Sequence, residues 1–481
     1  MRPRKIDDFL WELPKGYVNG MQVPGRVFAS EELFHKAVED RAVEQVANMA
    51  TIPGIVDFAV AMPDIHWGYG FPIGGVAATD VERGGAVSPG GVGFDIGCGV
   101  RLVRSELSYE QDVKPRIQEL VEELGRRVPR GVGGKGRMRL DREGLETVLW
   151  EGVKYPLAKG AGWEEDAEFT EDFGVLPNPK PANVSERAKL RGTPQLGSLG
   201  AGNHFLELQV VDQIRDQEAA EILGLHPGQV CMMIHSGSRG VGHQTCTDHL
   251  KEIDRLMPKL GIDVPDRQLA CVPIDHEAGD SYFGAMDAAG NFARANRQVL
   301  TDAARHAFQE VFSRSSKDMG MSVVYDIAHN LAKIESYETD GEKRDLCVQR
   351  KGATRAFGPG HPELPDKYKP IGQPVIIPGS MGTPSFVLVG TGEAKDLAFN
   401  STCHGAGRAM SRTKAKKRMS GADLKRELES QDIHIAKSRL KLLSEEAPYA
   451  YKDAAEIVET CEGARLSRVV ARLRPIGIVK G

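Results

Sequence analysis

The segment Gly91–Arg101, GVGFDIGCGVR, combines a highly flexible backbone with two potential metal ligands. Four of the nine residues from Gly91 to Gly99 are glycine, and glycine allows positive φ angles and a close approach of the main chain to a ligand. Asp95 offers a hard oxygen donor, and Cys98 offers a thiolate that can bridge two metals. Taken alone, the segment is more typical of a glycine-rich turn around a small buried cysteine, so a metal site depends on the rest of the chain.

Composition excludes several broad classes of protein. The 481 residues are 41% hydrophobic and 27% charged, as in ordinary globular proteins. The net charge of −5 argues against a globally basic nucleic-acid binder, so any such contact must be local. The seven cysteines include no CxxC pair and do not indicate a disulfide framework. No apolar run is long enough for a membrane span. We therefore expect a reduced, cytoplasmic protein without membrane contact.

Strand-like and helix-like segments alternate along the chain and predict an α+β fold of mixed sheets layered with helices. Residues 1–28 are expected to be irregular or β, and Ser30 to cap a helix. The other expected elements are strands from Phe58, within 202–211, 230–240 and 323–330 and on both sides of SMGTPS, and helices over 113–124 and 291–311. Three regions are expected to lack strands: a surface excursion over 162–195, a loop over about 335–373, and a polar helical C-terminal region ending in GIVKG.

Histidines recur where the predicted strands meet loops. His66, His204, His235 and His329 occupy such places, and His404 lies in a glycine-rich turn. A single histidine there is more often structural, but several together with an Asp-x-x-Cys segment favour a metal site. The candidate ligands outnumber those of one tetrahedral zinc and suit two metals that share a thiolate; they are Asp95, Cys98, His204, His235 and His329. The donor types are compatible with Mn, Zn, Fe or Co.

The STCHGAGR turn gives His404 a different context. Gly405 and Gly407 can present backbone N–H groups to phosphate, and a neutral imidazole is a competent nucleophile toward phosphorus beside a metal. A sixth metal ligand is an equally good interpretation of His404. Six positive charges follow between Arg408 and Arg418. Such a run is usually a solvated face, but beside a phosphate-binding turn it predicts contact with a nucleic-acid backbone.

Six motifs occur in a fixed order and together resemble the RtcB family of RNA-splicing ligases: GFDIGCG, GNHFLE, HSGSRG, DIAHN, GSMGT and CHGAGR. The resemblance runs almost from end to end and includes the terminal VKG. It implies an RNA ligase that joins a 3′-phosphate or 2′,3′-cyclic phosphate end to a 5′-hydroxyl end in tRNA splicing or RNA repair. It also implies GTP as cosubstrate and two Mn²⁺ ions as cofactors.

The resemblance further implies roles for individual residues. His404 would become guanylated, and GMP would pass to the RNA 3′-phosphate before the 5′-hydroxyl displaces it. Cys98 would bridge two Mn²⁺ ions, one completed by His235 and His329 and the other by Asp95 and His204. The guanylate would be bound by Asn203, Glu207, Ser380, Ser385, Gly405, Ala406, Gly407, Tyr451 and Lys480, with Glu207 accepting the guanine N–H groups. RNA phosphates would be held by Arg239, Lys351, Arg408 and Arg412.

Asp64 and His66 also fall in a motif of the family, and we expect them near the RNA end without a defined role. Tyr451 and Lys480 are assigned by the resemblance alone, since a penultimate lysine usually belongs to a frayed tail. Because the candidate residues extend from Asp95 to Lys480 and must converge, we expect residues 1–481 to form one compact catalytic domain with long loops.

Two other classes of function fit the same residues. A binuclear metallohydrolase acting on RNA phosphate esters would use the same ligands, with His404 as a sixth ligand or an acid and with no need for GTP. A non-catalytic RNA-binding protein with a structural metal would leave the surplus of ligands unexplained. The expected partners of the ligase are GTP, tRNA halves or broken RNA ends, and an archease-type activating protein.

Overall fold

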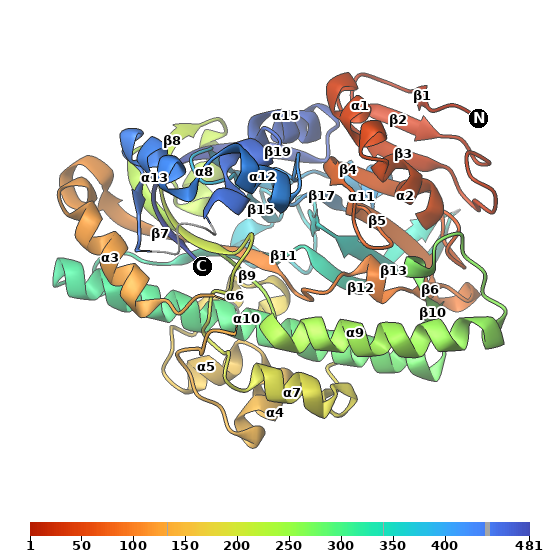
Figure 1. Ribbon diagram of the computed structural model, residues 1–481, viewed down its shortest axis with the longest axis horizontal. Helices are drawn as coiled ribbons and strands as arrows, with labels where there is room; N and C mark the ends of the chain where they lie inside the picture. The colour runs from red at the N-terminus through yellow and green to blue at the C-terminus, as the bar shows by residue number, and fades with distance from the viewer. Residues whose placement is uncertain (132, 340, 438–442) are drawn as a thin grey trace.

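Two large β-sheets lie at the centre of the computed structural model, which describes residues 1–131, 133–339, 341–437 and 443–481 (Figure 1). Within these residues, the first sheet has seven strands in the order β1 (Arg4–Lys5), β2 (Leu10–Leu13), β3 (Gly25–Phe28), β4 (Ala59–His66), β5 (Ile73–Asp80), β13 (Glu342–Lys351) and β12 (Asn330–Thr339). The second has eight, in the order β11 (Val323–Ala328), β7 (Gly99–Ser108), β9 (Gln229–Ser236), β8 (Phe205–Ile214), β19 (Ser467–Lys480), β16 (Ser385–Gly390) and β15 (Pro374–Ile377), with β18 (His434–Ile435) pairing with β19.

Two short ribbons connect these sheets to the surrounding loops. They are formed by β6 (Ala86–Val87) with β10 (Val272–Pro273), and by β14 (Ala353–Arg355) with β17 (Ser401–Cys403). The helices of the described residues are α1 (Glu31–Glu39), α2 (Ala42–Met49), α3 (Ile117–Arg127), α4 (Arg142–Glu151), α5 (Lys154–Ala158), α6 (Glu165–Glu168), α7 (Glu186–Gly192), α8 (Gln217–Leu223), α9 (Arg239–Leu256), α10 (Glu277–Phe312), α11 (Ala394–Ala398), α12 (Arg412–Arg418), α13 (Gly421–Ser430) and α15 (Ala454–Gly463). The expected α+β architecture is confirmed.

Helices cover the sheets with their apolar sides. α1, α2 and α15 pack against the seven-stranded sheet. α3 and the C-terminal half of α10 cover one face of the eight-stranded sheet, and α8 packs on the other face. As Figure 1 shows, α9 and α10 run along one side of the molecule, with α4, α5 and α7 beyond them. The site-bearing strand ends are thus supported by helices on several sides.

The predicted helices are present where the sequence patterns placed them. The Ser30 hydroxyl accepts a hydrogen bond from the N–H of Leu33 at 3.2 Å and caps α1. The helix predicted over 291–311 is the second half of α10, which begins earlier, where His276 caps it through Ala278 N–H. α10 is buried on nearly all sides, including Arg294, Arg297 and Arg305. This burial requires partners for three guanidinium groups.

The loop predicted over about 335–373 was wrong in its first half. β12 and β13 pair along their whole length, from Asn330 opposite Lys351 to Thr339 opposite Glu342, and β14 follows. The charged residues that suggested a loop lie mainly toward the hairpin end, where several side chains are exposed. A hairpin end that extends into solvent does not need apolar residues, so its sequence lacks the alternation on which strand prediction relies.

The C-terminal prediction was right for the helices and wrong for the last residues. α13 and α15 are helical, but β19 is a 14-residue strand between β8 and β16. Pro475 and Gly477 argue against a central strand in sequence. They are tolerated here because the β19–β8 register shifts between these two residues. The penultimate Lys480 is therefore held in a sheet and is only 5% exposed.

Residues 162–195 are less superficial than their acidic and Pro-rich sequence suggests. α6 and α7 lie within them, and Asp166 and Glu171 are buried. Asp166 pairs with Arg305 at 2.6 Å, and Glu171 pairs with Lys333 at 2.8 Å. The expectation of a surface excursion is therefore wrong for these two carboxylates, because long-range cationic partners allow their burial.

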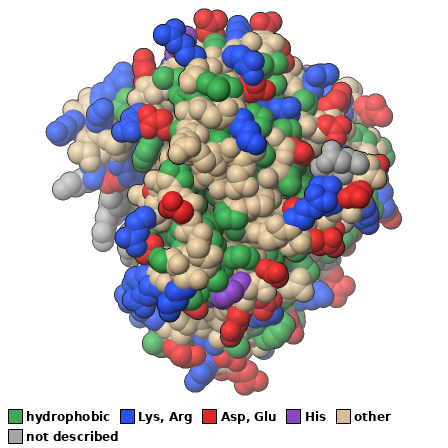
Figure 2. All heavy atoms as spheres, turned by 90° about the vertical axis from the view of Figure 1, so that its right-hand side faces the viewer, with side chains coloured by type: hydrophobic (Ala, Val, Ile, Leu, Met, Phe, Trp, Pro, Cys, Tyr) green, Lys and Arg blue, Asp and Glu red, His purple; other side chains and the backbone are tan. Residues whose placement is uncertain are grey.

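The surface agrees with a chain of small net charge. On the face shown in Figure 2, acidic and basic side chains are intermixed over most of the surface. Among the described residues, the structure contains no helix with the length and hydropathy that crossing a bilayer requires.

Candidate functional site

The register of four neighbouring strands brings the predicted metal ligands together. Gly99 of β7 lies opposite Ser236 of β9, and Phe205 of β8 lies opposite His235. Cys98 and His204, which immediately precede these strands, therefore converge on His235. On the other side of β7, Ala328 of β11 pairs with Gly99. This pairing places His329 beside Cys98, and the main-chain N–H of His329 donates to the Cys98 carbonyl at 2.8 Å.

The ligand atoms of this cluster lie at spacings suited to metal coordination. Cys98 Sγ is 3.4 Å from His204 Nε2 and 3.3 Å from His235 Nε2. His235 Nε2 is 3.4 Å from His329 Nε2, and Asp95 Oδ2 is 2.8 Å from His204 Nε2. The sulfur and nitrogen atoms of Cys98, His204 and His235 all lie within 4.8 Å of one another. All five predicted ligands thus form one continuous cluster.

The electrostatics of the cluster favour neutral imidazoles and an ionised aspartate. Burial lowers the pKa of both His235 and His329 well below the usual value, so their ring nitrogens keep lone pairs for a metal. Burial raises the pKa of Asp95, but His204 and Arg239 outweigh it and hold this pKa below the usual value. Burial and then Asp95 raise the pKa of the Cys98 thiol. A bound cation would reverse that shift, because a coordinated thiol is deprotonated.

Arg297 of α10 holds the main chain next to two of the predicted ligands, and the sequence patterns did not indicate it. Its Nη1 donates to the carbonyls of Gly97 at 2.9 Å and Ser236 at 2.8 Å, which neighbour Cys98 and His235. Its other nitrogens bind the fully buried Asp326, with Nη2–Oδ1 at 2.7 Å. The Arg297 and Arg101 guanidiniums overcome burial and lower the pKa of Asp326 to about 2. An arginine inside a helix that is otherwise rich in alanine was the available sequence signal.

His404 reaches the cluster through a second set of strand pairings. Ala353 of β14 bonds to the His329 carbonyl and pairs with Cys403 of β17. The rings of His329 and His404 are consequently 4.8 Å apart, centre to centre. Gly352 has φ +59°, and a Cβ there would lie 3.1 Å from His404 Cε1 and 2.3 Å from Ile73. Only glycine fits this approach.

Asp64 of β4 holds His404 from the other side. Its Oδ2 lies 2.5 Å from His404 Nδ1 and accepts the main-chain N–H of His404 at 3.1 Å. Burial raises the pKa of Asp64, but the adjacent imidazole outweighs it and leaves the pKa below the usual value. The turn after His404 packs equally closely, since a Cβ on Gly407 would lie 2.4 Å from the Asp64 carbonyl oxygen. The structure thereby gives Asp64, whose role was undefined, a direct contact with His404.

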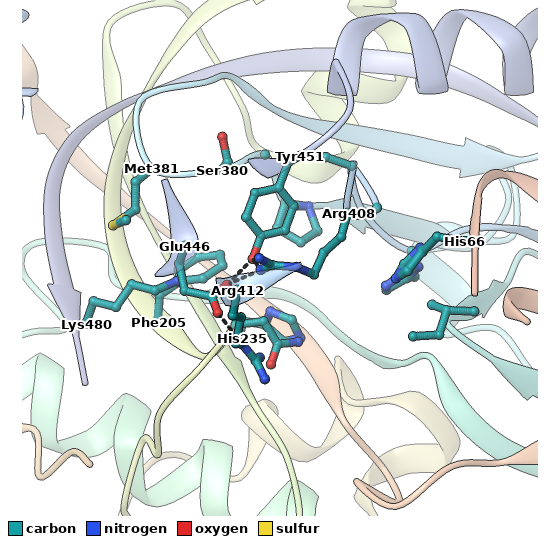
Figure 3. Close-up of a pocket in the computed structure, with 18 of the residues that line it drawn as sticks. His66, Phe205, His235, Ser380, Met381, Arg408, Arg412, Glu446, Tyr451 and Lys480 are labelled. Carbon is teal, nitrogen blue, oxygen red and sulfur yellow. Dashed lines mark hydrogen bonds and ion pairs between the residues drawn. The ribbon is translucent and has the colours of Figure 1, made fainter. Parts of the chain in front are cut away.

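A cavity of about 550 Å³ opens beside His404, and we call it the His404 cavity (Figure 3). His235 also lines it, so the cavity reaches the metal-ligand cluster. Eight of the nine residues predicted to bind a guanylate line it: Asn203, Glu207, Ser380, Gly405, Ala406, Gly407, Tyr451 and Lys480. The ninth, Ser385, is fully buried behind the wall. There, its hydroxyl accepts hydrogen bonds from Gly379 N–H and from Gln209.

Glu446 organises the cationic wall of the His404 cavity. It is 2% exposed, and its carboxylate accepts from Arg408 Nη1 at 3.0 Å and from Arg412 Nε at 2.8 Å. The Tyr451 hydroxyl donates to the same carboxylate, and Figure 3 shows these groups meeting beside Lys480. Burial lowers the pKa of Lys480, an effect that Glu446 and Glu207 oppose. Glu446 was not predicted, because it lies outside the motifs of the sequence.

Glu207 is the unusual carboxylate of this cavity. It is 4% exposed, and burial raises its pKa to about 8, although Gln209 and Lys480 act in the opposite direction. Its described hydrogen-bond donor is the side-chain amide of Gln209, at 2.5 Å. A buried carboxylate that accepts so few hydrogen bonds from the protein is suited to accept hydrogen bonds from a ligand.

A second cavity, of about 630 Å³, adjoins the first, and we call it the Arg239 cavity. Asn203, Arg412 and Glu446 line both cavities, whereas Asp95 and His204 line only the second. Cys98 and His329 line neither cavity. Cys98 lies between His204 of the second cavity and His235 of the first. The cluster is therefore accessible from two sides.

Three of the four residues predicted to hold RNA phosphates line one or both cavities, and the fourth does not. Arg412 lines both cavities, Arg239 lines the second, and Arg408 lines the first. Arg239 Nη1 lies 3.1 Å from His204 Nδ1. Lys351 lines neither cavity, because its Nζ donates to the carbonyls of Tyr69 at 2.5 Å and Phe71 at 3.2 Å. Burial lowers the pKa of Lys351 to about 7.

Comparison with known proteins agrees with the motifs. A family model described as tRNA-splicing ligase RtcB matches residues 45–481. The tRNA-splicing ligase RtcB of Archaeoglobus fulgidus is 52% identical over 99% of this chain and 98% of its own length. That of Thermococcus kodakarensis is 49% identical over the same shares. The RNA-splicing ligase RtcB of Mycobacterium tuberculosis is 50% identical over 91% of this chain and all of its own length. The chain therefore belongs to the RtcB family of RNA-splicing ligases.

Proposed function

We propose that this protein is an RNA ligase that joins 3′-phosphate or 2′,3′-cyclic phosphate ends to 5′-hydroxyl ends, with GTP as cosubstrate and His404 as the guanylated nucleophile. The observation that carries the proposal is the position of His404, between a metal-ligand cluster and a cavity of nucleotide size. Residues 1–481 would act as one catalytic domain, since strands from both ends of the chain contribute to the site.

Asp64 prepares His404 for attack on phosphorus. With Asp64 Oδ2 at 2.5 Å from Nδ1, the carboxylate favours the tautomer that carries its proton on Nδ1. Nε2 then keeps its lone pair and attacks the α-phosphorus of GTP, and pyrophosphate leaves. The imidazole gains a positive charge as the bond forms, and the Asp64 carboxylate stabilises that charge. A 2′,3′-cyclic phosphate end is first hydrolysed to a 3′-phosphate. GMP then passes from Nε2 to the RNA 3′-phosphate, and the 5′-hydroxyl displaces GMP.

The walls of the His404 cavity fit the parts of a guanylate. Glu207, once ionised, accepts the N1 and N2 hydrogens of guanine, whereas adenine offers an acceptor at N1. Arg408, Arg412 and Lys480 supply positive charge for phosphate oxygens. The backbone from Gly405 to Gly407 adds N–H groups beside the nucleophile.

The residues of the cluster fit two divalent metal ions that share one ligand. His235 Nε2 and His329 Nε2 face each other at 3.4 Å, and neutral imidazole nitrogens in that position need a cation or a proton between them. Cys98 would be the shared ligand, with His235 and His329 on one side and Asp95 and His204 on the other. Bound Mn²⁺ would neutralise charge on phosphate oxygens and stabilise attacking and leaving oxygens.

The RNA ends would occupy the two cavities, where Arg239, Arg408 and Arg412 offer phosphate contacts. Lys351 keeps its proposed role only if its bonds to Tyr69 and Phe71 are exchanged for a phosphate. An archease-type protein is the proposed activating partner, and split tRNAs or broken RNAs are the proposed substrates. The described cysteines are all free, which agrees with the cytoplasm as the proposed compartment.

The decisive experiment is incubation with α-labelled GTP and Mn²⁺ followed by a denaturing gel. Wild-type protein should retain an acid-labile, alkali-stable label that His404→Ala loses, and ligation of matched RNA ends should be lost with it. His306→Ala, an exposed histidine on α10, is the matched control and should label normally. Hydrolysis of RNA ends without any protein label would instead identify a metallohydrolase. Label that persists in His404→Ala would move the nucleophile to another residue.

A further inference from the structure

Three aromatic side chains meet at the edge of the Arg239 cavity. His243 lines this cavity, and the Phe94 ring lies 5.2 Å from the His243 ring with an interplanar angle of 31°. Tyr69 packs edge-on against Phe94, with ring centres 5.3 Å apart. Tyr69 is 37% exposed, His243 is exposed and Phe94 is half-buried. The three rings therefore form a continuous aromatic surface that the core does not cover.

This aromatic surface is tied rigidly to the metal-ligand cluster. Phe94 immediately precedes the ligand Asp95. His243 follows Arg239 by four residues at the start of α9, and both side chains line the Arg239 cavity. Arg239 contacts His204, and His243 contacts Phe94. A ligand group that touches Arg239 would thus have the aromatic surface one helical turn away.

The chemistry around the surface is that of a nucleotide site. Arg191, Arg239 and Arg412 line the same cavity and provide positive charge for a phosphate backbone. Partial burial of the ring and then the nearby Arg191 lower the pKa of His243, which favours an uncharged ring that can stack. Aromatic side chains beside a basic groove are the recurrent means by which proteins bind unpaired bases.

The in-line geometry of the proposed reaction indicates which RNA strand binds in the Arg239 cavity. Displacement at a phosphoryl group proceeds roughly in line, so the attacking oxygen enters opposite the leaving group. The leaving GMP belongs to the His404 cavity. Among the cavities found in the described part of the chain, the Arg239 cavity is the other one that reaches predicted metal ligands. The 5′-hydroxyl should therefore approach from the Arg239 cavity.

We propose that Tyr69, Phe94 and His243 form a stacking surface for the base of the nucleotide that carries the RNA 5′-hydroxyl. The inference rests on the proposed ligase function for the identity of that strand. It adds a binding site for a nucleobase, since stacking on an aromatic surface positions the hydroxyl without selecting a sequence.

The test compares two single-stranded RNAs with a 5′-hydroxyl, identical except that one lacks the base of its first nucleotide. Their affinities for wild type, His243→Ala, His243→Phe and the control His306→Ala are measured by anisotropy in Mn²⁺ without GTP. In wild type and His306→Ala, removal of the base should weaken binding roughly 5- to 50-fold, as expected for one stacked base. His243→Ala should bind the complete RNA more weakly by about the same factor and bind the base-less RNA like wild type. His243→Phe should restore the difference.

Two outcomes would overturn the stacking surface: equal affinity of wild type for both RNAs, or an equal loss for both in His243→Ala. A 2-aminopurine base at the first position provides a second readout, since stacking should quench its fluorescence in wild type and not in His243→Ala. Labelling by α-labelled GTP separates the two proposals. Protein that takes label but ignores the first base refutes only the stacking surface, whereas protein that discriminates the base and takes no label refutes the ligase.

Discussion

The metal-ligand cluster and the cationic wall of the His404 cavity adjoin each other but are built differently. The cluster is placed by main-chain register, since Cys98, His204 and His329 flank strands that pair beside His235. The wall is placed by side-chain contacts, in which Arg408, Arg412 and Tyr451 converge on Glu446 (Figure 3). Substitutions that disturb the metal-ligand cluster should therefore lower the stability of the fold as well as metal affinity. Substitutions in the cationic wall should mainly lower ligand affinity.

The largest expected effect is that of Arg297→Met beneath the cluster. Asp326 would lose one of its two guanidinium partners in a fully buried position, and the carbonyls of Gly97 and Ser236 would lose their donor. Breaking such a pair costs about 3–5 kcal/mol of unfolding free energy. Because the same side chain orients the ligand loops, Mn²⁺ affinity should also fall roughly 10- to 100-fold.

Arg305→Met is the matched control for this prediction. Arg305 lies on the same helix and pairs with the buried Asp166 at 2.6 Å, away from the ligand loops. Denaturant unfolding and Mn²⁺ titration should therefore show a comparable loss of stability with unchanged metal affinity. If both variants lose metal affinity equally, the register of the strands does not depend specifically on Arg297.

An intermediate effect is expected from Glu446→Ala in the cationic wall. Without the carboxylate, Arg408, Arg412 and Tyr451 lose the partner that holds them in place, and hydrogen bonds to charged groups contribute about 1.5–3 kcal/mol each. GTP affinity, measured by calorimetry, should fall roughly tenfold while the thermal midpoint moves by only a few degrees. Glu429→Ala, which removes the exposed partner of Lys425 on α13, should change neither. Tighter GTP binding in Glu446→Ala would show that this carboxylate mainly repels phosphate.

The smallest expected effect is a pH dependence that originates at Glu207. Its folded pKa of about 8 lies above the unfolded value of about 4.3. Its contribution to stability is therefore full below about pH 4 and is lost as the pH rises through about 8. Guanine binding has the opposite dependence, since only the carboxylate accepts both guanine N–H groups.

Calorimetric GTP titrations should consequently show about fivefold tighter binding at pH 8 than at pH 7, beyond any change that the Glu207→Gln variant shows over the same range. In Glu207→Gln, the pH dependence that remains comes from other groups, such as the phosphates of GTP. The difference between the two proteins therefore gives the contribution of Glu207. Parallel pH profiles for the two proteins would mean that Glu207 does not contact guanine.

The two regions also differ in how far the sequence predicted them. Strand ends rich in histidine indicated the metal ligands. The structure brings all five together because Cys98, His204, His235 and His329 lie at or beside the ends of paired strands, and Asp95 lies in the turn that leads into β7. Asp64 was identified without a role, and its contact with His404 depends on a pairing between segments about 340 residues apart. Glu446 and Arg297 were missed because a buried charge has no local pattern. Its burial is tolerated only where distant partners converge.

The fold shows the same division. The capping residue Ser30 correctly predicted α1. Apolar spacing correctly predicted α3 and the second half of α10, because these helices bury one or more faces. It failed for β12 and β13, whose outer end is exposed, and for β19, where a bulge accommodates Pro475 and Gly477. The local sequence pattern reflects which side chains of a segment are buried. The pairing partner of a strand and the position of a bulge depend on contacts with the rest of the chain.

By itself, the sequence determined which atoms are available for chemistry: a thiolate, a carboxylate and four imidazoles next to glycine-rich turns. The tertiary structure alone decided that His404 lies between Asp64 and His329, that Lys480 belongs to a strand inside a sheet, and that Glu446 gathers the cationic wall. The physical reason is that donor chemistry belongs to a residue type. Distance, burial and the pKa shifts that follow from them arise only when remote segments pack together.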